Sequence, residues 1–445
     1  MGDANTTGDG NTQTTANATG GGNTQAMANN HSMIWPPPAY TGKVRFDVWE
    51  AQLDICKNLY RILFKGTSKI PLNQARIHKI LFRFKLSPGE NTRKEDFISI
   101  DAGFISVDEF FCPNWTIHSL DKKKVFFAEM PKPISDYTID KYPFIYQNLF
   151  QECIRVAEID FKEYLKLAEK YESEINYVPP KCLLITNTAR SASTLFGSML
   201  QHSGHSTVFG EHPALTTIAI GFCQGFWNEN DVMQLLNSTI KILRKNFPPN
   251  HLLIFKARSI ETFLVPFLSK QFPEIQHIFM FRKNGLKSVE KMLSLGDSIY
   301  INMCQMYIHF PSLMKCLTSL IWNTFKELKP ATILEASIIT FAEPYFNYKK
   351  YQILYNFPII WQHELIEAPE KVLAPIFEKF EIPDTFIPAA IDRMKYDSQD
   401  GTFLSQKIMK KYSATKNVTP ELKEKILVYA KHFEIEPNLL GIFDD

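Results

Sequence analysis

Residues 181–200 read KCLLITNTARSASTLFGSML. The apolar run at 182–185 predicts a buried strand, and the apolar stretch at 195–200 predicts a helix. Between them lies a loop of small hydroxyl-bearing residues, so the helix would begin where unpaired amides and the helix dipole favour an anion. An ordinary capped helix is the alternative, because serine and threonine are common N-caps. The side chains that would add donors for an anion are Arg190, Ser191, Ser193 and Thr194.

The chain after residue 181 alternates between short apolar segments and helical patterns. This alternation favours a parallel sheet that is covered by helices on both faces. We therefore expect an α/β fold with a three-layer, P-loop-type parallel sheet flanked by helices. The expected strands are 182–186, 207–209, 252–256, 277–281 and 358–363, and the expected helices include 231–246, 259–271 and a C-terminal helix at 421–433 capped by Thr419.

The chain before residue 181 has a different character. Residues 1–40 are rich in Asn, Thr, Gly and Ala and end near three prolines, which predicts a disordered low-complexity tail. Residues 41–178 mix several patterns and predict an N-terminal α+β extension to a P-loop domain at 179–445. Within the extension we expect a helix at 43–64, two short strands within 97–111 and a long amphipathic helix at 146–173.

Composition argues against several classes of protein. The formal net charge is only +2 and no basic stripe alternates with aromatic residues, so nucleic acid is not an expected partner. The seven cysteines include no C-x-x-C pair, so no metal site is expected. Neither an apolar run of about 18 residues nor a secretory signal is visible, so we expect a cytoplasmic protein without a transmembrane segment. Gly2 fits the loose pattern for N-myristoylation.

The loop is not a Walker sequence, because the pattern G-x-x-x-x-G-K-S/T does not occur. In addition, Arg282 follows the expected strand at 277–281, where a magnesium-dependent nucleotidase would need an acid. A cation at that place would suit a second anionic group of a nucleotide whose first anionic group is held by the loop at 188–194. A P-loop kinase or hydrolase is therefore the less favoured interpretation.

Three segments, in this order, resemble elements of the sulfotransferase superfamily. Residues 188–194 resemble the loop that holds a 5′-phosphosulfate, in which a basic residue and hydroxyl residues follow the first strand. The sequence FRKNGLKSV at 281–289 resembles the element that holds a 3′-phosphate. IWQHELIEAP at 360–369, followed by FEKFEIP at 377–383, resembles the family segments Y-E-D-L-x-x-x-P and F-L-G-I-P. Residues 41–178 resemble the N-terminal extensions of uncharacterised invertebrate sulfotransferase-like proteins.

The resemblance implies a sulfotransferase, which moves a sulfuryl group from 3′-phosphoadenosine 5′-phosphosulfate to a hydroxyl or amine. The acceptor would be a small molecule or a glycan, and the reaction requires no metal. The resemblance also implies that the loop holds the 5′ end of the donor and that Arg282 holds its 3′-phosphate. The implied donor-binding residues are Arg190, Ser191, Ala192, Ser193, Thr194, Arg282 and Ser288.

The sequence leaves two candidates for the catalytic base. Cytosolic members of the family carry Lys-Thr-His after a strand, whereas residues 256–258 read KAR here. Membrane-bound members use a Glu shortly after the first helix, and Glu211 stands at that place, with His212 as the second candidate. A carboxylate paired with a nearby arginine is the structural alternative for Glu211. Lys256 is the candidate for stabilising the bridging oxygen of the donor, with a solvated lysine as its alternative.

Three positions depart from the family pattern. Ala189 and Ala192 stand where glycine is usual, and an alanine at positive φ costs about 1 kcal/mol or more. Glu290 stands where a serine usually faces the 3′-phosphate, and a carboxylate there would repel the phosphate. These departures keep a second interpretation open, namely a catalytically silent, sulfotransferase-like protein that binds a nucleotide or a partner.

Two further segments carry weaker expectations. The aromatic residues at 345–351 are expected to pack in the core, with an acceptor cleft as the alternative. Residues 397–402 are polar and stand where relatives place a loop that covers the nucleotide.

Overall fold

The computed structural model describes residues 32–33, 69–85, 89, 91–174, 178–294, 322–415 and 418–441. All of these described residues belong to one compact unit. Nearly all of the expected tail, and the helix expected at 43–64, lie outside the described residues. The boundaries expected at residues 40 and 178 stay predictions.

A five-stranded parallel sheet forms the centre of the second half of the chain. Its strand order is β11-β10-β7-β9-β8, and every neighbouring pair runs parallel. All five strands lie where the sequence predicts them, although the last is only two residues long because a helix begins at Gln362. The strands are β7 (Lys181–Asn187), β8 (Ser206–Gly210), β9 (Leu252–Lys256), β10 (Gln276–Phe281) and β11 (Ile360–Trp361).

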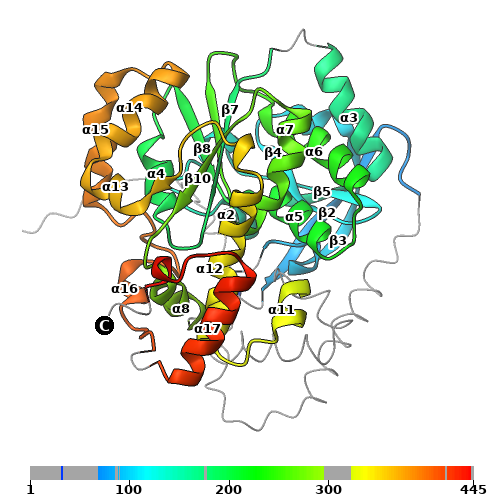
Figure 1. Ribbon diagram of the computed structural model, residues 1–445. Coiled ribbons are helices and arrows are strands. Elements are labelled where there is room, and N and C mark those ends of the chain that lie inside the picture. Colours follow the sequence, from blue (N-terminus) through cyan, green and yellow to red (C-terminus); the bar gives the residue numbers. More distant parts are fainter. Residues whose placement is uncertain are drawn as a thin grey trace, which may run out of the picture. The chain divides into compact units, whose positions relative to one another are not determined.

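Helices pack on both faces of this sheet because alternate strand residues point to opposite sides. Leu183 and Ile185 of β7 pack on one side with α4, α13, α14 and α15, whereas Leu184 packs on the other side with α5, α6 and α7. Figure 1 shows these two groups of helices to the left and right of the sheet. Their bounds are α4 (Ser193–Met199), α5 (Pro213–Cys223), α6 (Glu229–Arg244), α7 (Val265–Gln271), α13 (Gln362–Glu367), α14 (Pro369–Phe380) and α15 (Ile387–Asp392).

The C-terminal helices complete the cover over β10. Phe279 and Phe281 pack against α8 (Leu286–Ser294), α12 (Ile333–Lys350) and α17 (Pro420–His432). The ring of Tyr348 stacks on Phe279 at 4.3 Å, which confirms the expectation that the aromatic residues at 345–351 pack in the core. The side chain of Thr419 accepts a hydrogen bond from Leu422 N and caps α17 as expected.

A six-stranded sheet, antiparallel except for the β1–β2 pair, precedes the parallel one. The path is β1-β2-β6-β5-β4, and β3 pairs with β2. These strands supply the β part of the expected α+β extension. They are β1 (Ser32–Met33), β2 (Gln74–Phe84), β3 (Phe97–Ser106), β4 (Trp115–Leu120), β5 (Lys124–Glu129) and β6 (Arg155–Asp160), with helices α2 (Ile145–Glu152) and α3 (Phe161–Glu174).

Two predictions within the extension are wrong. Residues 97–111 form one strand and a 3₁₀ helix (Val107–Phe111) instead of two strands. Residues 146–173 form α2, β6 and α3 instead of one helix. The four inner residues of β6 are all buried between β2 and β5, and such a run has no alternation that separates a strand from a buried helix.

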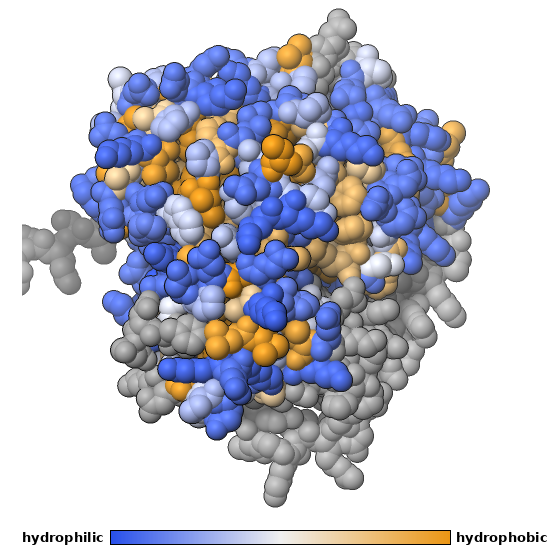
Figure 2. Space-filling model, in the orientation of Figure 1, coloured by the Kyte–Doolittle hydropathy of each residue, from blue (hydrophilic) through white to orange (hydrophobic). Residues whose placement is uncertain are grey.

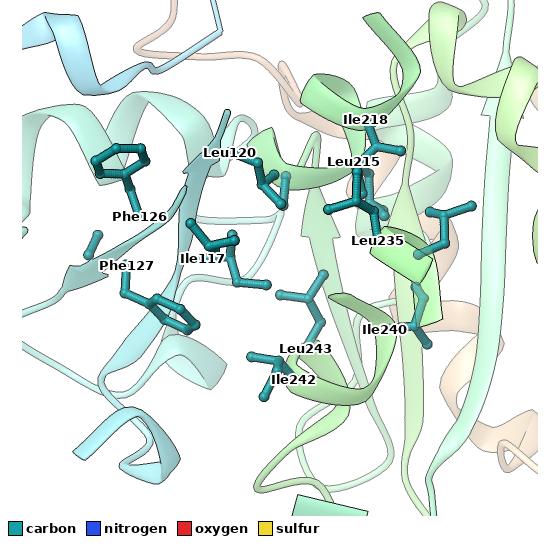
Figure 3. Close-up of a cluster of buried hydrophobic side chains, with 14 of the residues drawn as sticks. Ile117, Leu120, Phe126, Phe127, Leu215, Ile218, Leu235, Ile240, Ile242 and Leu243 are labelled. Atoms are coloured by element: carbon teal, nitrogen blue, oxygen red, sulfur yellow. The ribbon is translucent and has the colours of Figure 1, made fainter. Parts of the chain in front are cut away.

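One hydrophobic cluster joins the antiparallel sheet to the helices of the parallel sheet. Ile117 and Phe127 from the antiparallel sheet belong to the same buried cluster as Leu215 of α5 and Leu243 of α6 (Figure 3). The remaining elements are short. They are α11 (Trp322–Leu328), α16 (Gln406–Met409) and the 3₁₀ helices Lys94–Asp96, Ile134–Asp136, Ser259–Leu264, Gln352–Leu354, Asp384–Phe386, Arg393–Lys395 and Pro437–Leu439.

The surface carries both hydrophobic and hydrophilic side chains. On the face shown in Figure 2, hydrophobic residues lie in groups between hydrophilic ones. Among the described residues, no helix has the length and hydropathy needed to cross a bilayer.

Candidate functional site

The sheet topology creates one point where a ligand is favoured. After β7 the chain passes through α4 towards β8 on one side, and after β10 it continues towards β11 on the other side. Adjacent strands whose connections leave in opposite directions mark the usual ligand site at the carboxyl edge of an open α/β sheet. The loop that follows β7 begins beside the end of β10, since Thr188 N donates a hydrogen bond to Met280 O at 3.1 Å.

The loop after β7 adopts a constrained backbone. Arg190 and Ala192 have φ values of 63° and 66°, in the left-handed region, whereas Ala189 does not have a positive φ. A residue with a Cβ pays about 1–2 kcal/mol in this region. The position of Ala192 is therefore one where glycine would relieve strain, and the position of Ala189 is not.

Two hydroxyls in this loop are buried and have no hydrogen-bond partner among the described residues. They are Oγ1 of Thr188 and Oγ of Ser191, and both residues are 0% exposed. An unsatisfied buried hydroxyl costs about 1–3 kcal/mol, so each one needs an explanation such as a ligand. Ser193 and Thr194, at the start of α4, are also buried.

Two arginines place positive charge at the same point. Burial lowers the pKa of Arg190, the nearby charge of Arg282 lowers it further, and Asp397 acts in the opposite direction. Burial also lowers the pKa of Arg282. Two guanidiniums that repel each other in a partly buried place favour an anion between them. The structure thus brings together Arg190 and Arg282, which lie about ninety residues apart in the sequence.

The carboxylate of Glu290, which the sequence analysis expected to repel a 3′-phosphate, is held by two hydrogen bonds. Both oxygens of this carboxylate are used by one residue, because Oε2 accepts from Thr415 N at 3.0 Å and Oε1 accepts from Thr415 Oγ1 at 2.5 Å. Glu290 therefore anchors the segment before α17 to α8. Ser288 lies half-buried in the first turn of α8.

Glu211 follows β8 directly and sits in a cationic environment. Its Oε1 accepts from Lys256 Nζ at 2.5 Å and its Oε2 accepts from Arg258 Nε at 2.9 Å. Only 13% of its side chain is exposed, and its φ is 55°. The pairing with an arginine that the sequence left as an alternative is therefore present, and so is the contact with Lys256.

The Glu211–Lys256 pair and the loop after β7 share one edge of the sheet. Lys256 is the last residue of β9, which runs beside β7, and Ala257 N donates to Ile185 O at 2.8 Å. Arg190, Glu211, Lys256 and Arg282 therefore lie at or just beyond the carboxyl ends of β7, β8, β9 and β10, whereas Ser288 lies further along the chain, in α8.

His212 has a structural role. Its Nδ1 accepts from Ala214 N and caps α5, so its proton lies on Nε2, which faces Thr116 Oγ1 at 3.2 Å. Burial lowers the pKa of this histidine to about 3. Both ring nitrogens are held by the fold, which leaves Glu211 as the better candidate for the base.

The antiparallel sheet and its connections contribute residues that the sequence analysis did not identify. Arg258 Nη2 donates to Gly89 O at 3.0 Å, and its guanidinium lies 4.1 Å from the centre of the Tyr146 ring. Gly210 lies so close to the extension that a Cβ at this position would be 2.0 Å from Pro143 O. No motif marks these residues, because each acts through contacts made only in the folded chain.

Asn91 ties the extension to the start of α5. Its Nδ2 donates to Pro213 O at 3.0 Å and to Thr217 Oγ1 at 2.8 Å. Together with Gly89 and Tyr146, it makes the extension one wall around Glu211 and Arg258.

Comparisons with known proteins find only distant structural neighbours. No family model and no curated protein matches this chain. Among solved structures, a sulfotransferase domain from the curacin biosynthetic pathway is 14% identical, with 58% of this chain and 98% of that chain covered and a TM-score of 0.32. Sulfotransferase STF9 from Mycobacterium avium is 12% identical over 62% and 81% of the two chains, with a TM-score of 0.35.

A sulfotransferase from Alicyclobacillus acidocaldarius is 9% identical over 58% of this chain and 98% of that chain, with a TM-score of 0.31. At such scores the function has to be argued from the residues of this chain.

Proposed function

We propose that this protein transfers a sulfuryl group from 3′-phosphoadenosine 5′-phosphosulfate to a hydroxyl or amine acceptor. The observation that carries the proposal is a pair of buried hydroxyls, Thr188 Oγ1 and Ser191 Oγ, that have no partner in the described part of the chain. They lie in the loop that carries Arg190, whose charge interacts with that of Arg282, at the switch point of the sheet. The order of the sequence segments that resemble sulfotransferases supports the same assignment.

In this proposal the loop binds the donor through its 5′ end. Arg190, Ser191, Ser193 and Thr194 hold the 5′-phosphosulfate, and the positive φ at Ala192 lets the backbone approach it. The second anionic group, the 3′-phosphate, binds Arg282 with help from Ser288. The guanidinium of Arg190 neutralises charge that develops on the leaving 5′-phosphate, where preorganised donors contribute most.

The transfer step then needs a base and a donor for the bridging oxygen. Glu211 takes the proton of the acceptor, the acceptor oxygen or nitrogen bonds to sulfur, and the bond from sulfur to the 5′-phosphate oxygen breaks. The leaving group is 3′-phosphoadenosine 5′-phosphate. Lys256 is the donor for the bridging oxygen. When its Nζ turns from Glu211 Oε1 to that oxygen, it also frees Glu211 Oε1 to act as the base.

The double ion pair of Glu211 supports a second candidate. A carboxylate that accepts from both Lys256 and Arg258 is well suited to a structural role. In that case the protein binds the nucleotide as a catalytically silent member of the same fold class.

Labelled donor distinguishes the two candidates. The protein is incubated with ³⁵S-labelled 3′-phosphoadenosine 5′-phosphosulfate and a panel of hydroxyl and amine acceptors. We expect labelled product and 3′-phosphoadenosine 5′-phosphate in equal amounts, and a loss of about 10²–10⁴-fold in rate for Glu211→Gln with donor binding retained. Binding without transfer favours the silent member, and a preference for ATP with magnesium contradicts both.

A further inference from the structure

The side chain of Gln399 connects two residues of the proposed donor site. Its Oε1 accepts a hydrogen bond from Arg190 Nη1 at 2.6 Å, and its Nε2 donates to Thr194 Oγ1 at 3.3 Å. Arg190 and Thr194 are both assigned above to the 5′-phosphosulfate. One carboxamide thus uses the guanidinium edge and the hydroxyl that an anion would use.

The segment that carries Gln399 is fixed by its own hydrogen bonds. Asp397 accepts from Gln399 N at 3.0 Å through Oδ1 and from Gln406 N at 2.6 Å through Oδ2. Thr402 Oγ1 donates to Gln399 O at 2.7 Å. Leu404 is buried in a small cluster with Phe144 and Tyr146 of the extension. The backbone of residues 397–406 therefore has a definite place beside the loop, and the Gln399 side chain reaches from it to Arg190.

The chemistry of a carboxamide explains how it can occupy an anion position and still be displaced. It offers an acceptor to Arg190 and a donor to Thr194 but carries no charge. A hydrogen bond from arginine to an anion is about twice as strong as one to a neutral acceptor. A phosphosulfate therefore displaces the carboxamide, but its apparent affinity is reduced by the fraction of molecules in which Gln399 holds the position.

We propose that Gln399 is an internal competitor for the donor, which sets donor affinity by occupying Arg190 and Thr194 until the phosphosulfate replaces it. This inference rests on the proposed function, because it takes the loop to be the seat of the 5′ end. It adds a residue from beyond the parallel sheet, more than two hundred positions after Arg190, to the determinants of binding.

Two substitutions at Gln399 have opposite expected effects. Gln399→Ala removes the competitor, so we expect the Kd for 3′-phosphoadenosine 5′-phosphate to fall by roughly 3–10-fold. Gln399→Glu places a carboxylate on Arg190 and repels the ligand, so we expect the Kd to rise by about tenfold or more. Gln406→Ala is the matched control, because the exposed Gln406 uses only its backbone amide in the segment.

Isothermal titration calorimetry with 3′-phosphoadenosine 5′-phosphate measures the Kd of four full-length proteins, namely the native protein and the three variants. Tighter binding by Gln399→Ala, weaker binding by Gln399→Glu and no change in Gln406→Ala support the proposal. Unchanged or weaker binding by Gln399→Ala overturns it while leaving the proposed function intact. Binding by Gln399→Ala alone supports it, and no binding by any of the four proteins overturns the proposed function and this inference together.

Discussion

Ala192 holds a backbone conformation that suits glycine. Its φ of 66° lies in the left-handed region, whereas Ala189, three residues earlier, does not have a positive φ. We predict that Ala192→Gly raises the free energy of unfolding by about 0.5–1 kcal/mol, because a left-handed alanine costs more than the added freedom of the unfolded chain. Ala189→Gly should lower it by a similar amount. Urea denaturation of the two variants checks the pair, and a loss of stability in Ala192→Gly would be inconsistent with this backbone.

The strand, hydroxyl-rich loop and helix at residues 181–200 were predictable from the sequence, but the surroundings of this loop were not. Arg190, Ser191 and Thr194 stand within one local pattern, a strand followed by hydroxyl residues and a helix, and a local pattern is enough to place them. Gln399 and Tyr146 reach the site only through contacts between distant parts of the chain. The same limit applies to Glu290, whose carboxylate looked repulsive in the sequence and is bound to Thr415 in the structure.

At the scale of elements, the strands of the parallel sheet were predicted well and those of the extension were not. Strands such as β9 are short apolar runs between helical patterns, and this contrast marks them clearly. β6 lies between two helices without a glycine or proline to separate it, and Cys153 and Ile154 are its only break from α2. The sequence there mixes apolar and polar residues throughout as an amphipathic helix would, and only pairing with β2 and β5 makes the middle a strand.

The extension should also hold the first turn of α5 in place. Asn91 reaches both Pro213 O and Thr217 Oγ1, so we predict that Asn91→Ala increases hydrogen exchange in residues 213–217. Exchange in α6 should not change. Asn114→Ala is the control, because Asn114 lies in the same extension but bonds to Glu129 and Met130. Mass spectrometry of peptides from both helices provides the measurement, and equal effects of the two variants would rule out a specific tie.

At the scale of the whole molecule, buried acids make stability depend on pH. Burial raises the pKa of Glu261 and of Glu343 to about 8, and the neighbouring Glu211 also raises that of Glu261. These groups stay protonated in the fold while the unfolded chain ionises above its ordinary pKa of about 4.5. Their stabilising contribution is therefore complete below pH 4.5 and is lost as pH rises towards 8.

We predict that between about pH 5.5 and pH 8 the free energy of unfolding of the native protein decreases relative to that of Glu261→Gln, because only the native protein loses the contribution of this carboxyl. The amide keeps an acceptor for Thr216 Oγ1 but cannot ionise. Urea midpoints at several pH values test this prediction. Parallel curves for the native protein and Glu261→Gln would show that Glu261 does not titrate in this window.

The central claim is that Arg190 and Arg282 bind one nucleotide at the carboxyl edge of the parallel sheet. Calorimetric titration with 3′-phosphoadenosine 5′-phosphate, without magnesium, tests it most directly. We predict one binding site per chain and a loss of about tenfold or more in affinity for each of Arg190→Ala and Arg282→Ala. Arg155→Ala, which removes the partner of Glu129 in the extension, should bind as the native protein does. Absence of binding, or binding that neither Arg190→Ala nor Arg282→Ala weakens, would contradict the claim.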